Sequence, residues 1–187
     1  LTNSLKPYAC CRHTHAADYC AQLLRGEHRL EPEHITRIVD HTYQVAVNTV
    51  DNPEPSTPYG YKFSGQYCTA AMLVYGHLGE SAFTPEATSD PRVRRLMDKI
   101  TLVCDPELEA SYQADRNRWA HRLEVTLEDG RVLTRQVEYP YGDFNNPFTW
   151  AYEHEKFHTL ADGVLGPDRV AALVERLPHL EELDDIN

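Results

Sequence analysis

Ten consecutive residues near the start of the sequence bring together six side chains that could do chemistry: Lys6, Cys10, Cys11, Arg12, His13 and His15. They lie directly before a predicted helix, and the free N–H groups at a helix start attract anions. Ammonium and guanidinium groups there would hold a carboxylate, and Arg12 could bind both of its oxygens. A histidine could also move a proton near neutral pH. This pattern favours a cationic pocket for an acidic substrate.

Two other interpretations of this stretch stay open. It could be a surface loop with solvated charges over buried cysteines. Alternatively, Cys10 or Cys11 could be a nucleophile, because a nearby histidine and a helix start lower the pKa of a thiol. Buried cysteines are more often inert packing residues.

A second polar segment, Lys62–Tyr67, comes directly before an apolar helix. It places Ser64 and Tyr67 at the helix start, where Tyr67 could donate a proton or a hydrogen bond to a substrate. The simpler alternative is a capping serine and a core tyrosine. A third polar group, Glu155–His158, is expected on a solvated helix face.

The sequence predicts no metal site. The five cysteines contain no CxxC pair, and the histidines show no ligand spacing such as HxxxH on one predicted helix. An odd, scattered set of cysteines is also a poor disulfide framework, which indicates a reducing cytoplasm. A zinc module remains an alternative that metal analysis would detect.

The composition is that of an ordinary globular protein. Of the 187 residues, 41% are hydrophobic and 25% charged, and the formal net charge is −11. This charge argues against general affinity for nucleic acid or anionic membranes. No apolar run approaches the roughly 18–20 residues of a membrane span. The length fits one domain, and because Leu1 lies so close to the reactive stretch, we expect part of a longer polypeptide.

Local patterns predict the helices that could position these groups. They are expected at 15–25, 66–78, 90–100, 149–165 and 168–177. Thr14 is expected to cap the first helix and Gly26 to end it.

The remaining segments predict a small sheet. Residues 35–50 favour extended structure, although 43–50 could form a short helix, and 101–104 predict a short strand. A hairpin is expected for 119–127 and 131–139. Loops are expected at 52–60 and 141–147. The elements together indicate an α+β fold, with helices packed on a small, mainly antiparallel sheet.

Several motifs resemble the MmgE/PrpD family and occur in the order expected for it. They are KPYACCRHTHAAD (6–18), YKFSGQYCTAAMLVYG (61–76), DPRVRRLMDKI (90–100), LEDGR (127–131), YGDFNNPFT (141–149) and EKF (155–157). The resemblance implies that residues 1–187 are the smaller C-terminal α+β domain of a two-domain protein, without its N-terminal helical domain. It also implies a homodimer that needs neither a metal nor an organic cofactor.

The resemblance also implies roles for individual residues. Lys6 matches the lysine that opens the family's active-site motif, and Tyr67 matches a tyrosine lining the cleft between domains. Together with the local pattern, this predicts catalytic roles for Lys6, Tyr67 and His13. Substrate-binding roles are predicted for Arg12, His15 and Ser64.

The implied reaction is proton removal next to a carboxylate of a small di- or tricarboxylate. A hydro-lyase of the 2-methylcitrate dehydratase type is expected, with an epimerase or isomerase as the nearest alternative. A cis-aconitate decarboxylase-like activity is a further alternative, although in that branch a histidine stands five residues after the lysine, where this chain has Cys11. A non-catalytic binding or assembly module is the alternative of another class. Because only one wall of the cleft is encoded, we expect this chain alone to be inactive.

Overall fold

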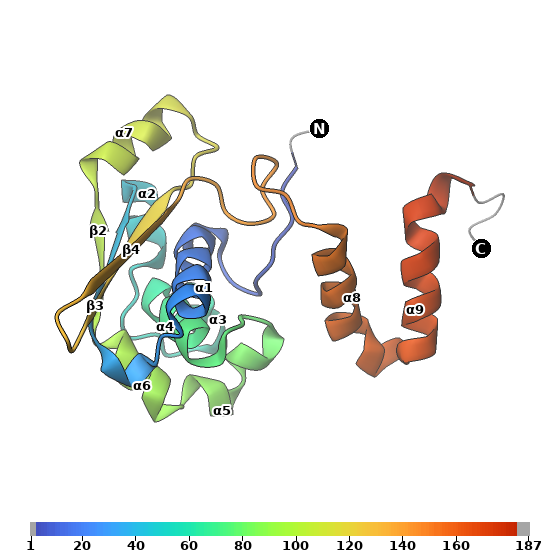
Figure 1. Ribbon diagram of the computed structural model, residues 1–187, viewed down its shortest axis with the longest axis horizontal. Coiled ribbons are helices and arrows are strands. Elements are labelled where there is room, and N and C mark those ends of the chain that lie inside the picture. The colour runs from blue at the N-terminus through green and yellow to red at the C-terminus, as the bar shows by residue number, and fades with distance from the viewer. Residues whose placement is uncertain (1–2, 183–187) are drawn as a thin grey trace. The chain divides into compact units, whose positions relative to one another are not determined.

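The computed structural model describes residues 3–182, and the chain divides into two compact units, Leu1–Asn146 and Pro147–Asn187. Within the described residues, nine α-helices accompany one four-stranded sheet. The predicted α+β class is therefore confirmed (Figure 1).

The sheet belongs to the first unit. It contains β1 (Ile35–Thr42), β2 (Ile100–Cys104), β3 (His121–Leu127) and β4 (Val132–Val137), in the order β2-β1-β3-β4. The pair β1–β2 is parallel, and the pairs β1–β3 and β3–β4 are antiparallel. The hairpin β3–β4 confirms the clearest local prediction, because alternate residues of β3 are buried as a half-covered strand requires.

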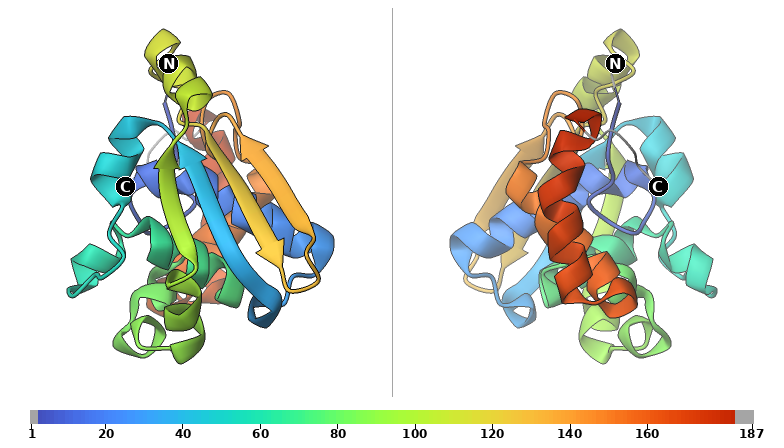
Figure 2. Two further views of the ribbon diagram at one scale, coloured as in Figure 1. Left: turned by 90° about the vertical axis from the view of Figure 1, so that its left-hand side faces the viewer. Right: turned by 90° about the vertical axis from the view of Figure 1, so that its right-hand side faces the viewer.

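Two helices build the core against this sheet. Helix α1 (His15–His28) packs on β3, β4 and α4, and α4 (Gly65–Tyr75) also contacts β2. Figure 2 shows both helices behind the sheet, on one of its faces. All residues of α4 from Gly65 to Leu73 are buried. Gly65 allows this close packing, because an added Cβ would lie 3.0 Å from Leu102 and 3.3 Å from the backbone oxygen of Val50, and these neighbours would have to shift.

Shorter helices complete the first unit. They are α2 (Gln44–Val50), α3 (Pro58–Tyr61), α5 (Pro85–Thr88), α6 (Pro91–Met97) and α7 (Pro106–Ala114), with 3₁₀ turns at Arg12–Thr14, Pro32–His34 and Glu80–Phe83. The sequence analysis missed the four-residue helices α3, which begins inside the loop predicted at 52–60, and α5, and it also missed the longer helix α7. Its start nevertheless carries a recognisable signal, because Asp105 accepts hydrogen bonds from the N–H groups of Glu107 and Leu108, and Pro106 occupies the first turn.

Several predicted boundaries were wrong. Helix α1 runs through the exposed Gly26, and its C-cap is Arg29, at a left-handed φ of 48°. Thr14 does not cap the helix with its side chain, because its hydroxyl lies 2.7 Å from the Asp18 carboxylate. Gly76, at φ 78°, ends α4 three residues before the predicted end. The alternative of a short helix after β1 is confirmed by α2.

The second unit is a helical hairpin. Helix α8 (Trp150–Leu165) packs on α9 (Pro167–Arg176), and a 3₁₀ segment (Leu177–Glu182) follows. Thr149 caps α8 by accepting the N–H of Tyr152 at 3.2 Å. Both predicted helices are confirmed. Across residues 3–182, no helix combines the length and apolar character that crossing a membrane would demand.

Candidate active site

The reactive stretch is an irregular segment held by backbone hydrogen bonds to distant loops. The N–H of Ala9 donates to the carbonyl of Leu78 at 2.8 Å. The N–H of Cys11 donates to the carbonyl of Lys62, also at 2.8 Å. The second bond brings the two polar segments found in the sequence side by side, which places Lys62 next to the stretch that carries Lys6.

A pocket of about 210 Å³ lies where these two segments meet. Its lining includes Lys6, Tyr8, Cys10, Cys11, Tyr59, Lys62 and Phe63. The Lys6 ammonium donates to the carbonyl of Cys10 at 3.0 Å, and the Lys62 ammonium pairs with the exposed Glu80 carboxylate at 2.9 Å. Two ammonium groups beside aromatic walls suit a small carboxylate, because such a ligand needs positive charge at one end and apolar cover along its length.

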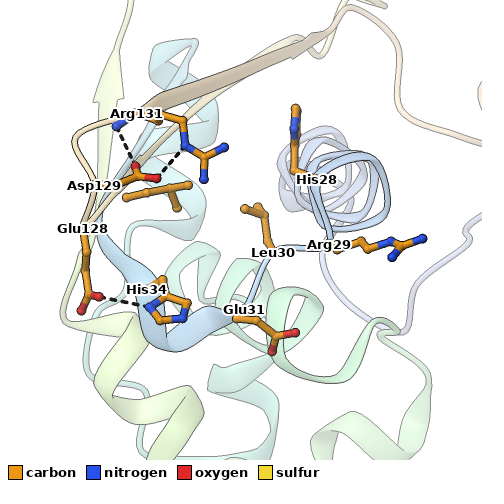
Figure 3. A pocket seen from close by; sticks show the side chains of 9 residues that line it. His28, Arg29, Leu30, Glu31, His34, Glu128, Asp129 and Arg131 are labelled. Atoms are coloured by element: carbon orange, nitrogen blue, oxygen red, sulfur yellow. Dashed lines mark hydrogen bonds and ion pairs between the residues drawn. The ribbon is translucent and has the colours of Figure 1, made fainter.

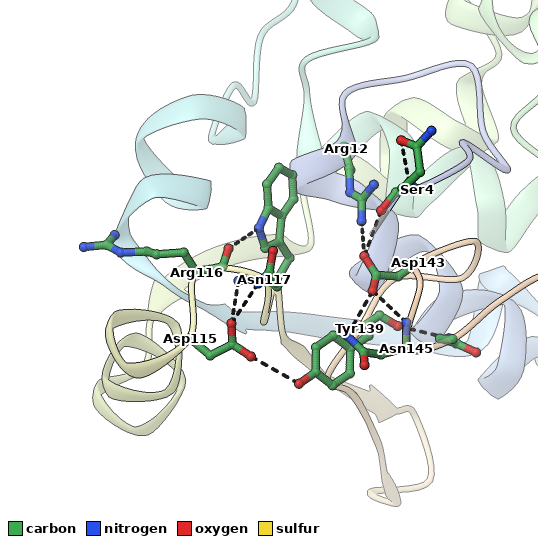
Figure 4. A network of polar contacts seen from close by, with 11 residues as sticks. Ser4, Arg12, Asp115, Arg116, Asn117, Tyr139, Asp143 and Asn145 are labelled. Carbon is green, nitrogen blue, oxygen red and sulfur yellow. Dashed lines mark hydrogen bonds and ion pairs between the residues drawn. The ribbon is translucent and has the colours of Figure 1, made fainter. Parts of the chain in front are cut away.

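Arg12 points to a different set of partners. Its guanidinium pairs with the buried carboxylate of Asp143, which also accepts the hydroxyl of Ser4 at 3.0 Å (Figure 4). It lies 5.0 Å from the ring centre of Trp119, a cation–π distance. The ion pair with Asp143 therefore connects the reactive stretch to the loop that follows β4. Part of the Arg12 guanidinium is already occupied by this pair.

His13 lies beside Arg12 in an aromatic setting. Its ring stacks on Trp119, with centroids 4.5 Å apart and an interplanar angle of 3°, and its Nδ1 lies 2.7 Å from the hydroxyl of Tyr43. Burial, together with the positive charges of His121 and Arg12, lowers the pKa of His13 to about 4. The imidazole is therefore neutral at pH 7.

The buried residues His121 and Asp40 lie next to Tyr43. His121 Nδ1 lies 2.7 Å from an oxygen of Asp40, and both side chains are 1% exposed. The ring of His121 meets the ring of Tyr43 edge-on at 6.1 Å. This arrangement fixes Tyr43, and through it His13.

The other three predicted site residues are in the core. His15 is 1% exposed, with Nε2 3.4 Å from the carbonyl of Cys10. Ser64 caps α4 by accepting the N–H of Tyr67 at 3.0 Å, and its hydroxyl donates to Asn52 at 2.6 Å. Tyr67 is 0% exposed and donates to the carbonyl of Ala82, and burial raises the pKa of its phenol. Ser64 and Tyr67 thus occupy the structural positions that the sequence offered as the simpler alternative.

The six predicted residues therefore fall into three places rather than one pocket. Lys6 borders the pocket, Arg12 and His13 form a cluster with aromatic partners, and the remaining three are inside the fold. The sequence analysis missed Lys62, Tyr43, Trp119 and Asp143 as site neighbours. Two of these had a signal, since Lys62 opens the second polar segment and Asp143 lies in the YGDFNNPFT motif.

Beneath the pocket, Cys10, Asp18 and Cys68 form a buried cluster. One donor atom from each lies within 4.8 Å of the other two. Among residues 3–182, this is the set of Cys, His, Asp and Glu side chains close enough to hold a metal ion. It offers three ligands, whereas structural zinc sites usually have four.

A larger pocket of about 300 Å³ lies elsewhere, around the ends of α1 and the β3–β4 hairpin (Figure 3). Its charged side chains pair with one another. His34 contacts Glu128 at 3.1 Å, and Arg131 contacts Asp129 at 2.7 Å, all four more than half exposed. Because these pairs are solvated and no residue of the reactive stretch 6–15 lines this pocket, it is a weaker candidate for chemistry.

Comparisons with known proteins agree with the motifs. A family model described as "MmgE/PrpD C-terminal domain" matches residues 8–179. The chain is 32% identical over 136 residues to "2-methylcitrate dehydratase, mitochondrial" of Yarrowia lipolytica, which covers 70% of this chain and 26% of that protein. It is 35% identical over 111 residues to "2-methylcitrate dehydratase" of Cupriavidus necator, covering 58% and 23%.

A third relative is "2-methylcitrate dehydratase-like protein oryR" of Aspergillus oryzae. The identity is 29% over 124 residues, which cover 63% of this chain and 25% of the relative. The chain spans about a quarter of the length of these curated relatives.

Proposed function

The chain belongs to the MmgE/PrpD family, in the part that corresponds to its C-terminal domain, and we propose that it supplies one wall of the active site of a 2-methylcitrate dehydratase-like hydro-lyase. The relatives named above support this reaction, because each carries that activity in its name. The substrate class is a small hydroxylated di- or tricarboxylate.

The observation that carries the proposal is the pocket with two lysines. Lys6 and Lys62 come from segments 56 positions apart in the sequence, and the backbone bond from Cys11 to Lys62 brings those segments together. In a dehydration, a base removes a proton from the carbon next to a carboxylate, and negative charge then builds on that carboxylate. Ammonium groups placed before the reaction stabilise this charge without reorganising.

The chain's own residues take distinct parts in this proposal. Lys6 binds the substrate carboxylate on which the charge develops. His13 lies outside this pocket, and its Nδ1 accepts a hydrogen bond from Tyr43, so its Nε2–H is the group that it can offer as a donor. Arg12 keeps the reactive stretch in place through Asp143. Ser64, Tyr67 and His15 maintain the core around α4 and α1, and no metal or organic cofactor is assigned.

The opposite wall is proposed to come from a helical domain in the same polypeptide, working as a homodimer. Near-attack geometry requires groups on both sides of the substrate. With one wall only, Lys6 would face water, where a charge contributes far less than in a closed site. The isolated chain is therefore proposed to fold without catalysing.

The test is a substrate panel applied to the complete polypeptide that contains this chain. Release of an unsaturated acid from a hydroxytricarboxylate, followed by its absorbance, supports the dehydratase. Turnover of an amino-dicarboxylate alone would move the protein to the epimerase alternative, and CO₂ release would move it to the decarboxylase. Ligand binding without turnover of any substrate would favour a binding module.

A further inference from the structure

The buried cluster beneath the pocket takes no part in the proposed reaction. Cys10 is 4% exposed, and Asp18 and Cys68 are 0% exposed. The Cys10 sulfur lies 3.6 Å from Asp18 Oδ2, and the Thr14 hydroxyl lies 3.3 Å from the same sulfur and 2.7 Å from the same carboxylate. Within the described chain, the second oxygen of Asp18 has no hydrogen-bond partner. A buried carboxylate so placed is a ready acceptor for the thiol proton.

We propose that Cys10 and Cys68 form an oxidisable pair, in which hydrogen peroxide reacts with Cys10 and a Cys10–Cys68 disulfide then closes inside the fold. Their sulfurs lie within 4.8 Å of each other. A disulfide is about 2.05 Å long, so the sulfurs need to approach by less than about 3 Å, within the range of side-chain rotation.

The surroundings favour reaction at Cys10 rather than at its neighbours. Burial opposes ionisation, but the Cys68 thiol, His15 and Thr14 outweigh it and lower the pKa of Cys10 well below its usual value. Burial and the adjacent Cys10 raise the pKa of Asp18, which therefore keeps the transferred proton. Burial raises the pKa of Cys11 instead. Low-pKa thiols beside a second cysteine are typical of peroxide-sensitive pairs.

The oxidation has two steps, formation of a sulfenic acid and then of the disulfide. The Cys10 thiolate attacks one peroxide oxygen, the O–O bond breaks, and the departing hydroxide takes the proton held by Asp18 and leaves as water. The sulfur is now a sulfenic acid. Cys68 loses its proton and attacks that sulfur, the S–O bond breaks, and a second water leaves. Two thiols are oxidised and one peroxide is reduced. Cys10 is among the lining residues of the pocket, so it is the member of the cluster nearest to solvent.

Closing the bond would connect the proposed carboxylate site to α4. The carbonyl of Cys10 accepts the Lys6 ammonium at 3.0 Å, so a bond from Cys10 to Cys68 holds the Lys6 turn against the helix. The oxidised chain is expected to unfold at a higher temperature than the reduced chain, because the disulfide restricts the unfolded state.

The test uses the 187-residue chain with hydrogen peroxide as the probe, followed by alkylation, trypsin digestion and mass spectrometry. Cys10 and Cys11 fall in the peptide that ends at Arg12, and Cys68 falls in Phe63–Arg92. The expected product is the cross-link of these two peptides, with the number of free thiols falling from five to three. Fragmentation between the adjacent cysteines identifies which one is bonded, and this readout needs no variant.

Four single substitutions test which cysteines form the disulfide. Cys10→Ser and Cys68→Ser should abolish the cross-link, and Cys68→Ser should leave a sulfenic acid on Cys10 that dimedone traps. Cys11→Ser and the exposed control Cys104→Ser should both retain the cross-link. The proposal is overturned if the wild-type cross-link runs through Cys11, if Cys10 bonds to Cys11, or if Cys104 is oxidised while Cys10 and Cys68 stay reduced.

Discussion

The Tyr43 hydroxyl lies 2.7 Å from Nδ1 of His13, and the same histidine stacks on Trp119. Burial raises the pKa of Tyr43, so its hydroxyl stays protonated and can donate. A hydrogen bond donated to Nδ1 leaves the imidazole proton on Nε2. Tyr43 thus selects the tautomer that His13 presents, while burial keeps the imidazole neutral.

The first prediction tests this contact. Tyr43→Phe removes a donor to neutral His13, so the pKa of His13 should rise somewhat above its value of about 4, while burial, the main cause of its low value, remains. The loss of one hydrogen bond should cost about 1 kcal/mol of stability. A pH titration of the histidine signals by NMR measures the shift. Tyr139→Phe is the control, because its hydroxyl lies 3.4 Å from Asp115 and should leave His13 unchanged. An unaltered His13 titration in Tyr43→Phe would contradict the assigned donor.

The second prediction concerns stability against pH. Folded His13 takes up a proton near pH 4, whereas in the unfolded chain it does so near 6.5, so unfolding binds a proton between these values. Stability is therefore expected to fall as the pH drops from 6.5 to 4, and His13→Gln should remove that contribution. Melting temperatures of the wild type and His13→Gln between pH 4 and pH 6.5 measure this contribution.

The exposed His34 provides a control of opposite sign. Glu128 raises the pKa of His34, so its contribution is present at low pH and disappears as the pH rises. His34→Gln should therefore lose stability below about pH 6. If His13→Gln and His34→Gln showed the same pH trend, the burial effect on His13 would be disproved.

The third prediction concerns the buried pair Asp40 and His121, which are both 1% exposed. Asp40→Ala leaves a buried imidazole N–H without its acceptor, which should cost about 2–3 kcal/mol. Asp40→Asn keeps an acceptor oxygen in the same place and should cost much less. Urea unfolding of the wild type and the two variants measures both losses of stability. Equal losses from the two substitutions would show that the acceptor oxygen is not what matters.

The fourth prediction separates structural from chemical roles for Ser64 and Tyr67. Ser64→Ala removes a helix cap and a bond to Asn52, and should cost about 1–2 kcal/mol. Tyr67→Phe loses the bond to Ala82 and should cost about 1 kcal/mol. In the complete polypeptide, both should keep turnover within a few-fold of wild type at temperatures where they are folded. A loss of orders of magnitude in folded Tyr67→Phe would restore the catalytic role that the sequence predicted.

Local patterns were enough to predict much of this fold. The alternation in β3 and the apolar run of α4 depend on neighbours within one element, so periodicity reveals them. The ends of α1 were wrong because tertiary contacts overrode local preference. Thr14 bonds to Asp18 instead of capping, and the helix passes through Gly26.

The site was harder to predict than the fold. The partner of Arg12 is Asp143, 131 positions away, and no local rule connects them. Likewise, Tyr43, whose hydroxyl meets His13, lies 30 positions away in the sequence, and its ring contacts His121 of β3. Residue types at 6–15 predicted a single cationic pocket, whereas the folded chain separates Lys6 from Arg12 and His13.

The most direct test of the central claim is the turnover of the complete polypeptide with Lys6→Met. Removing one charged donor from the developing negative charge should lower kcat/KM on a hydroxytricarboxylate by about 10²–10³-fold. Circular dichroism should stay unchanged, since Lys6 is exposed. The control Arg131→Met also removes an exposed cation, beside the hairpin turn, and should keep full activity. If Lys6→Met were folded and as active as Arg131→Met, the lysine pocket would not be the place where this protein binds its carboxylate.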